Sequence, residues 1–173
     1  MPNTLIAYFS RRDENYVGYG KQYLKKGHTE VAVEMLKELI SADVFPILMK
    51  KPYSAEYDAC MEESKRDYNL DARPELVELP ESIDAYDTII LAFPNYWNTM
   101  PMAVFTFLDA FDFTGKTILP LCTNEGGDLG RSEEDIKRVC PGAKLGKPLS
   151  LCGSGIAGSA PFIANWLKDN GLI

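Results

Sequence analysis

The chain has few of the residues that form metal sites or disulfide frameworks. It contains one histidine, His28, and four cysteines among 173 residues, and no two cysteines have the CxxC spacing. This pattern argues against a cysteine-rich metal site and against a disulfide-stabilised fold. We expect reduced and mostly buried thiols instead.

Long apolar runs and a basic charge excess are also missing. No apolar stretch approaches the roughly 18–20 residues that cross a bilayer. The N-terminus has neither the basic region nor the cleavage site of a secretory leader, so we expect a cytoplasmic protein. Lysine and arginine number 18 against 25 acidic residues, a net charge of −7. Nucleic acid is therefore not an expected partner, because phosphate contacts need a basic face.

Apolar runs of strand and helix character alternate along the chain. Five strands alternating with helices imply an α/β fold with a parallel sheet and right-handed crossovers. A doubly wound sheet of strand order 2-1-3-4-5, with helices on both faces, fits this count. We expect one domain over residues 1–173. The predicted strands are 4–9, 42–48, 88–92, 117–121 and 149–152, and the predicted helices are 29–40, 55–68, 102–111, one starting at 132, and 159–169.

The segment 11–28 interrupts this alternation. It holds three tyrosines (Tyr16, Tyr19 and Tyr23), three glycines and five basic residues. A first βα loop is normally two to six residues long, and a long ordered loop at the ligand end of a sheet is often a lid. We favour a lid over an insertion without a role, because the tyrosines give the loop something to pack with.

Polar and aromatic segments follow three of the predicted strands. They are residues 8–10, 93–101 and 122–130. Ligands of an open parallel sheet bind beyond the carboxyl ends of its strands, where the strand order reverses. These segments offer hydroxyls and glycines for a phosphate and aromatic side chains for a flat ring. We therefore expect a site for flavin mononucleotide (FMN).

The phosphate would bind where the first strand meets the first helix. Ser10 and the run Gly27-His28-Thr29 supply small polar groups and helix-end amides, and Gly27 permits close approach of the backbone. Arg11 is expected to have a secondary part in phosphate binding. His28 is either a contact to the phosphate or ribityl chain, or a surface residue near the helix start.

The second segment offers a surface for the flavin ring. Tyr96 and Trp97 directly follow a strand, with Pro94 before them, so they are available to stack on a flat ring. The alternative is an apolar plug over the sheet end. Asn95 and Asn98 can hydrogen-bond a polar ring edge or support turn geometry, and Asn98 suits a turn with positive φ.

The third segment would bind the polar edge of the ring. Its residues Thr123, Asn124, Glu125, Gly126 and Gly127 can present backbone amides to the pyrimidine oxygens. Two adjacent glycines allow close backbone approach. Such a pair is common in turns, so its meaning comes from its position beside the second segment.

Several segments carry a resemblance to a known family: residues 8–10, 13–16, 27–29, 94–104, 113–117, 123–130 with Ser132, and 140–143. In these segments the chain resembles the flavodoxin family, and more closely a bacterial flavodoxin-like branch with a long first loop. The resemblance implies a flavodoxin-like three-layer sandwich and an FMN cofactor. Flavodoxins usually have Gly-Asn-Thr in the phosphate loop, whereas Gly27-His28-Thr29 is similar to the branch of NAD(P)H:quinone oxidoreductases and tryptophan-repressor-binding proteins.

The sequence leaves the function open between two kinds of FMN protein. One is an electron carrier that exchanges electrons with a redox partner protein. The other is an NAD(P)H-dependent reductase that passes electrons to a small acceptor such as a quinone. A flavin-free interaction module is a lesser alternative. Either a monomer or a homodimer is compatible with the sequence.

Overall fold

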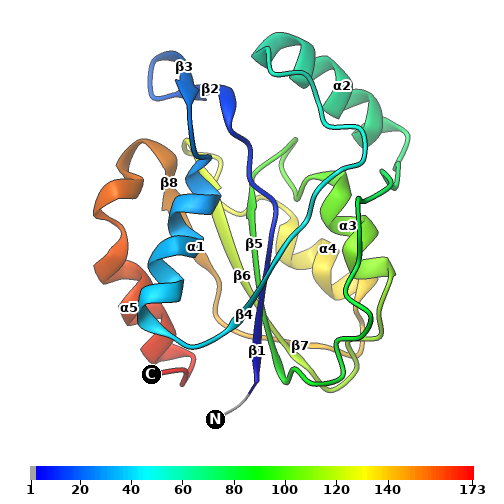
Figure 1. The fold of residues 1–173 in the computed structure, drawn as a ribbon, viewed down its shortest axis with the longest axis vertical. Helices are drawn as coiled ribbons and strands as arrows, with labels where there is room; N and C mark the ends of the chain where they lie inside the picture. The colour runs from blue at the N-terminus through cyan, green and yellow to red at the C-terminus, as the bar shows by residue number, and fades with distance from the viewer. Residues whose placement is uncertain (1–2) are drawn as a thin grey trace.

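A computed structural model describes residues 3–173, so the first two residues of the predicted domain lie outside it. Its centre is a parallel six-stranded sheet (Figure 1). The order is β4-β1-β5-β6, and two further short strands, β7 and β8, both pair with β6. The strands are β1 (Thr4–Tyr8), β4 (Asp43–Pro46), β5 (Thr88–Pro94), β6 (Thr117–Asn124), β7 (Lys144–Leu145) and β8 (Leu149–Cys152).

The first four positions of the predicted strand order are confirmed by β4-β1-β5-β6, but the predicted count of five strands is wrong. The fifth place in the sheet is shared by β7, which pairs with residues 117–118 of β6, and β8, which pairs with residues 121–124. Pro148 separates the two short strands. Proline has no N–H to donate to the ladder, which accounts for an interruption at this point.

Helices cover both faces of the sheet. Helices α1 (His28–Leu39) and α5 (Ala160–Asp169) lie on one face, and α3 (Met102–Asp109) and α4 (Ser132–Val139) lie on the other (Figure 1). Successive strand residues point to opposite faces. In β1, Leu5 and Ala7 belong to the core under α3, and Ile6 belongs to the core under α1 and α5. This arrangement confirms the flavodoxin-like three-layer sandwich.

Two elements lie beyond the carboxyl ends of the strands instead of on a face. Helix α2 (Tyr57–Asn69) is at this end (Figure 1), and only Cys60 and Ser64 of it are buried. The segment predicted as a long first loop contains an antiparallel hairpin of β2 (Asp13–Val17) and β3 (Gly20–Leu24). Gly18 has φ 62° in its tight turn, the positive φ that two-residue hairpin turns require.

The cysteines, a short linking helix and the lengths of the helices complete the description of the fold. The four cysteines are free, and Cys60, Cys122 and Cys140 are buried while Cys152 is exposed, which confirms the expected mostly buried thiols. A short 3₁₀ helix, Gly153–Gly158, links β8 to α5. No helix within residues 3–173 has the length and apolar character needed to cross a membrane.

Candidate functional site

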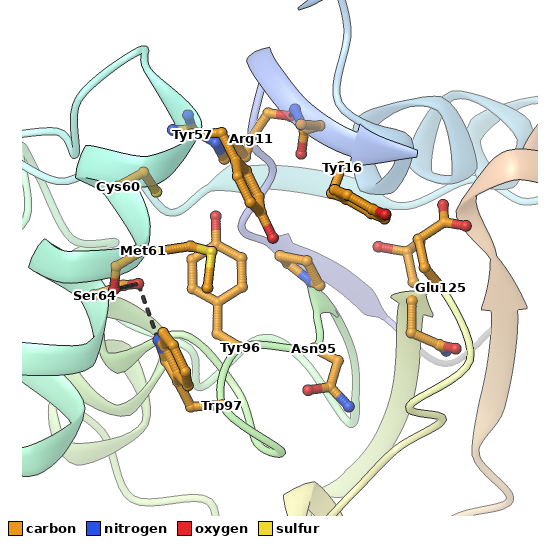
Figure 2. Close-up of a pocket in the computed structure, with 14 residues that line it drawn as sticks. Arg11, Tyr16, Tyr57, Cys60, Met61, Ser64, Asn95, Tyr96, Trp97 and Glu125 are labelled. Atoms are coloured by element: carbon orange, nitrogen blue, oxygen red, sulfur yellow. Dashed lines mark hydrogen bonds between the residues drawn. The ribbon is translucent and has the colours of Figure 1, made fainter. Parts of the chain in front are cut away.

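A cavity of about 330 Å³ lies at the carboxyl ends of β5 and β6 (Figure 2). We call it the aromatic cavity. The sheet, the hairpin segment and α2 all contribute to its walls. The lining residues are Arg11, Asn15 and Tyr16 near the hairpin, Tyr57, Cys60, Met61 and Ser64 of α2, Pro94, Asn95, Tyr96 and Trp97 after β5, and Thr123, Asn124 and Glu125 of the β6 segment.

Aromatic side chains lie on opposite sides of this cavity. Figure 2 shows Tyr16 and Tyr57 along one side and Trp97 along the other. The ring centroids of Tyr16 and Tyr57 are 6.1 Å apart. Aromatic rings prefer offset or tilted contacts at such distances. The arrangement suits a flat aromatic ligand inserted between the two sides.

Trp97 is held by α2. Its indole Nε1–H donates a hydrogen bond to Oγ of Ser64 at 3.0 Å. The ammonium group of Lys65 lies 5.2 Å from the centre of the indole ring, a cation–π contact. The orientation of the indole is therefore set by the protein before any ligand binds.

The segment after β5 makes a tight turn. Tyr96 and Thr99 exchange two backbone hydrogen bonds of 2.8 and 3.1 Å. The two central residues, Trp97 and Asn98, have φ of 54° and 67°. Positive φ at Asn98 was expected from its residue type. Positive φ at Trp97 was not, because a bulky residue rarely adopts it.

Asn95 links this turn to the segment after β6. Its Oδ1 accepts the backbone N–H of Asn98 at 3.0 Å. Its Nδ2 donates to the carbonyl oxygens of Gly127 (3.4 Å) and Asp128 (2.9 Å). Asn95 was expected either to hydrogen-bond the edge of the ring or to support the turn. These bonds support the turn. The carbonyl of Asn98 accepts a further hydrogen bond from the N–H of Arg131 at 2.7 Å.

The residues predicted to bind a phosphate meet at the start of α1. We call Ser10, Gly27, His28 and Thr29 the α1 junction. Oγ of Ser10 accepts the backbone N–H of Glu30 at 3.0 Å. A Cβ on Gly27 would overlap Oγ of Ser10 and the carbonyl oxygen of Arg11. Close approach therefore requires glycine here.

Thr29 is not open to a ligand. Its side chain is buried, and its Oγ1 is 2.8 Å from Oγ1 of Thr123 on β6. This bond ties α1 to the sheet. None of the α1 junction residues lines the aromatic cavity. Ser10 lines a neighbouring cavity of about 330 Å³, which shares Arg11 and Tyr96 with the aromatic cavity as common walls.

Glu125 connects three parts of the site. Its Oε1 lies 4.0 Å from Nδ1 of His28, and its Oε2 accepts the backbone N–H of Gly18 in the hairpin turn at 3.3 Å. The His28 side chain is only 17% exposed. Burial lowers the pKa of His28, and the nearby charge of Glu125 opposes this effect. His28 is therefore mainly a neutral packing residue near neutral pH.

Arg11 fixes the hairpin over the cavity. Its Nε and Nη2 donate to the carbonyl oxygen of Glu14 at 3.1 and 3.0 Å. Nη1 donates to the carbonyl of Ser54 at 2.9 Å, and Nη2 also donates to that of Ala55 at 3.0 Å. The carboxylate of Glu14 in turn accepts the N–H of Tyr57 at 2.9 Å. The hairpin covers the cavity in the position expected of a lid; movement of this lid stays a prediction.

The structure brings the predicted site residues to one end of the sheet in two groups. The group that lines the aromatic cavity consists of Arg11, Pro94, Asn95, Tyr96, Trp97, Thr123, Asn124 and Glu125. The others are the α1 junction residues, and Asn98, Gly126 and Gly127 in the adjoining turns. The predicted third loop begins within β6, which continues to Asn124.

Sequence reasoning missed the contribution of α2, and it expected segment 11–28 as a lid without assigning any of residues 12–26 to the site. The missed lining residues are Asn15, Tyr16, Tyr57, Cys60, Met61 and Ser64. A signal was present in α2. Tyr57, Cys60, Met61 and Ser64 recur at the spacing of one helix face within an otherwise charged segment.

Tyr96 has an unusual hydroxyl. Its Oη is buried and has no hydrogen-bond partner among the described residues. Burial raises the pKa of Tyr96 well above its usual value. Burial also raises the pKa of the neighbouring Cys60 thiol. Both groups are therefore neutral at physiological pH, and the Tyr96 hydroxyl keeps a proton to donate.

Comparison with known proteins identifies the family of the chain and similar folds. A family model described as flavodoxin matches residues 18–170. A protein from Bacteroides uniformis, provisionally described as a flavoprotein, is 27% identical with a TM-score of 0.76, over 96% of this chain and 98% of its own. No curated protein gives a significant match to the sequence.

Two more distant solved structures share the fold. A flavoprotein from Lactobacillus acidophilus in complex with FMN has 12% identity and a TM-score of 0.64, over 91% of this chain and 98% of its own. An NADH:FMN oxidoreductase in its apo form has 16% identity and a TM-score of 0.58. The match covers 96% of this chain and 87% of the oxidoreductase. At these identities the likeness concerns the fold alone.

Proposed function

The chain belongs to the flavodoxin family, and on that premise we propose that it binds FMN non-covalently and carries electrons through it. The flavin ring would lie in the aromatic cavity. The cavity itself supports this fit, since it has aromatic walls on opposite sides and a buried hydroxyl without a partner. The FMN complex of the similarly folded Lactobacillus acidophilus flavoprotein supports the choice of cofactor.

The covering of the cavity on two sides is the observation that favours an electron carrier. Tyr16 and Tyr57 lie on one side and Trp97 on the other (Figure 2). A ring bound between them would have both faces covered by protein. Hydride transfer from a nicotinamide needs an open face on which the second ring can stack, whereas single electrons can leave through the exposed edge. FMN would supply the electron-carrying ring, and this chain would orient and shield it.

The phosphate would lie toward the α1 junction. Oγ of Ser10 accepts a backbone N–H, so its own hydroxyl proton is still available to a phosphate oxygen. The N-terminal end of α1 contributes favourable potential for an anion. The Glu30 carboxylate in the first turn opposes this, and the Arg12 guanidinium 3.8 Å away partly offsets it.

A reductase that uses NAD(P)H is the second candidate. The likeness in fold to an NADH:FMN oxidoreductase favours it. So does the exposed ion pair between Lys21 and Asp58, 2.7 Å, which joins the hairpin to α2 at the surface. Exposed pairs contribute little to stability, so the hairpin could open and free one face of the ring. The acceptor would then be a small molecule such as a quinone.

One experiment tests binding and separates the two candidates. Purified apoprotein is titrated with FMN, and the complex is photoreduced stepwise without oxygen and separately mixed with NADPH and NADH. The carrier is expected to bind one FMN per chain, to show an intermediate spectrum during photoreduction, and to react slowly with both nucleotides. Rapid reduction by either nucleotide would favour the reductase. Absence of FMN binding would reject both and favour a flavin-free module.

A further inference from the structure

Arg11 lines the aromatic cavity and has unused hydrogen-bonding capacity. A guanidinium group has five N–H donors, and four hydrogen bonds engage it, all to backbone carbonyl oxygens. One N–H on Nη1 therefore remains. None of the ion pairs found within residues 3–173 involves Arg11. Its positive charge is fixed in place and has no counter-ion among residues 3–173.

The hydroxyl of Tyr96 also lacks a partner within residues 3–173. Its Oη is buried and lacks a hydrogen-bond partner in the described part of the chain. The Cys60 thiol is close enough to act on the pKa of Tyr96 as a weak hydrogen-bond partner, but the pair lies outside ordinary hydrogen-bond distances and angles. A buried hydroxyl without a partner destabilises the folded state. Such a group persists most readily where a ligand completes it.

The two groups share one wall of the aromatic cavity. Figure 2 shows the hydroxyl of Tyr96 directed toward the side of the cavity where Arg11 and Tyr57 lie. The Arg11 charge acts on Tyr96, Cys60 and Tyr57. A cationic donor and a neutral donor that face the same space are suited to an oxygen atom with negative charge.

We propose that Tyr96 and Arg11 form a binding site for a negatively charged oxygen of the reduced flavin ring. This inference rests on the proposed function. The oxidised ring is neutral. Bound FMN would supply a negatively charged oxygen after two-electron reduction, because loss of the N1 proton would leave a charge shared with the adjacent carbonyl group. The protein would therefore bind anionic reduced FMN more tightly than oxidised FMN.

The direction of the Arg11 side chain separates this role from phosphate binding. The backbone of Arg11 is packed against Gly27 at the α1 junction. Its guanidinium instead reaches the carbonyls of Ser54 and Ala55 before α2. The charge thus lies on the α2 side of the site, away from the helix end expected to hold the phosphate.

The test compares the affinity of apoprotein for oxidised and for dithionite-reduced FMN, measured by anaerobic titration at pH 6 and pH 8. In the wild type, the ratio of the two affinities should favour reduced FMN and increase with pH. Tyr96→Phe and Arg11→Gln should each lower this ratio at pH 8 by about ten-fold, and by less at pH 6. Arg11→Lys should retain most of it, since it keeps the charge.

Two controls correct for a lost hydroxyl and a lost charge. Tyr86→Phe removes a hydroxyl that is bound to Asp43, and Arg73→Gln removes a guanidinium that is paired with Asp71 and Asp109. Both should leave the ratio unchanged. Tyr96→Phe should also raise the melting temperature of the apoprotein, because an unpartnered buried hydroxyl is removed; this outcome marks a group kept for its ligand.

Two results would overturn the inference without touching the proposed function: FMN binding with an unchanged ratio in Tyr96→Phe, or a wild-type ratio that does not depend on pH. Loss of all FMN binding in the wild type would instead reject the proposed function. Arg11→Gln could unfold because Arg11 also fixes the hairpin, and the conservative Tyr96→Phe keeps the test decisive in that case.

Discussion

The α1 junction and the aromatic cavity lie at the same end of the sheet, but their polar groups are in opposite states. At the junction, Ser10 bonds to the N–H of Glu30, and Thr29 bonds to Thr123. In the cavity, the Tyr96 hydroxyl has no partner and the Arg11 charge has no counter-ion among the described residues. Of these junction side chains, only the hydroxyl proton of Ser10 is left for a ligand, whereas in the cavity a whole hydroxyl group and a charge lack partners within the described chain.

This difference indicates how the two regions contribute to binding. The junction acts through its folded shape, since its side chains hold the start of α1 against the first strand. The cavity acts through polar groups that have no partner or counter-ion among residues 3–173 and are free to bind a ligand. Substitutions at the junction should therefore change stability first, and substitutions in the cavity should change ligand affinity first.

Gly27→Ala should have the largest effect. The new Cβ would overlap Oγ of Ser10 and the carbonyl oxygen of Arg11, and a backbone group cannot move away as a flexible side chain can. We expect a loss of about 3 kcal/mol in the free energy of unfolding, measured by urea denaturation. Gly155→Ala is the matched control, because a Cβ there meets nothing within 4 Å. Equal stability of the two variants would contradict the account of the junction.

Trp97→Ala should affect the cavity with little effect on the junction. Loss of a stacked aromatic ring is expected to weaken FMN binding by about 1–2 kcal/mol, or roughly ten-fold. Tyr16→Ala should weaken FMN binding less, because Tyr16 belongs to the hairpin and its contact with the ring is lost whenever this lid opens. Fluorescence titration of the apoprotein with FMN measures both. If Trp97→Ala bound FMN as tightly as the wild type, the indole would not be part of the binding site.

Ser10→Ala connects the two regions. It removes the acceptor for the Glu30 N–H, which should cost about 1 kcal/mol of stability. It should also weaken binding of FMN more than that of riboflavin, since only FMN has the phosphate. Titration with both ligands separates the effects. Equal losses for FMN and riboflavin would mean that Ser10 serves the fold alone.

His28 should give the smallest effect, visible in the pH dependence of stability. Burial lowers its pKa in the folded state, so the unfolded chain binds the proton more readily. Stability should be complete above the unfolded pKa of about 6.5 and should fall as the pH drops toward the folded value. Urea denaturation between pH 7.5 and 5.5 should show this slope in the wild type and a smaller one in His28→Gln. Identical slopes would show that His28 does not titrate differently on folding.

The sheet and the sequence segments at its carboxyl end were predictable from local pattern. Apolar runs such as 88–92 become strands because both sides of each strand are buried between helices. The order of the strands follows from the alternation of strands and helices. The sharing of one sheet position by β7 and β8 depends on a proline whose effect on pairing is visible only once the neighbour is known.

The walls of the cavity were less predictable, because they depend on how distant segments meet. Helix α2 was predicted as a helix from its local pattern, but that pattern did not show that it lies over the sheet end or that its Ser64 holds the indole of Trp97. The sequence left Asn95 open between a contact to the ring and support of the turn. The turn is the observed role, because the Asn95 side chain bonds to the carbonyl groups of residues 127 and 128. Tertiary contacts between separate elements determine these roles.

The most direct test of the central claim is a crystal structure of the protein with FMN bound. The account predicts one FMN per chain, with the ring in the aromatic cavity between Trp97 and the pair of Tyr16 and Tyr57, and the phosphate toward Ser10 and the start of α1. A ring bound in the neighbouring cavity, lined by residues 46–49 beside β4, or on the outer surface of the hairpin, would contradict it.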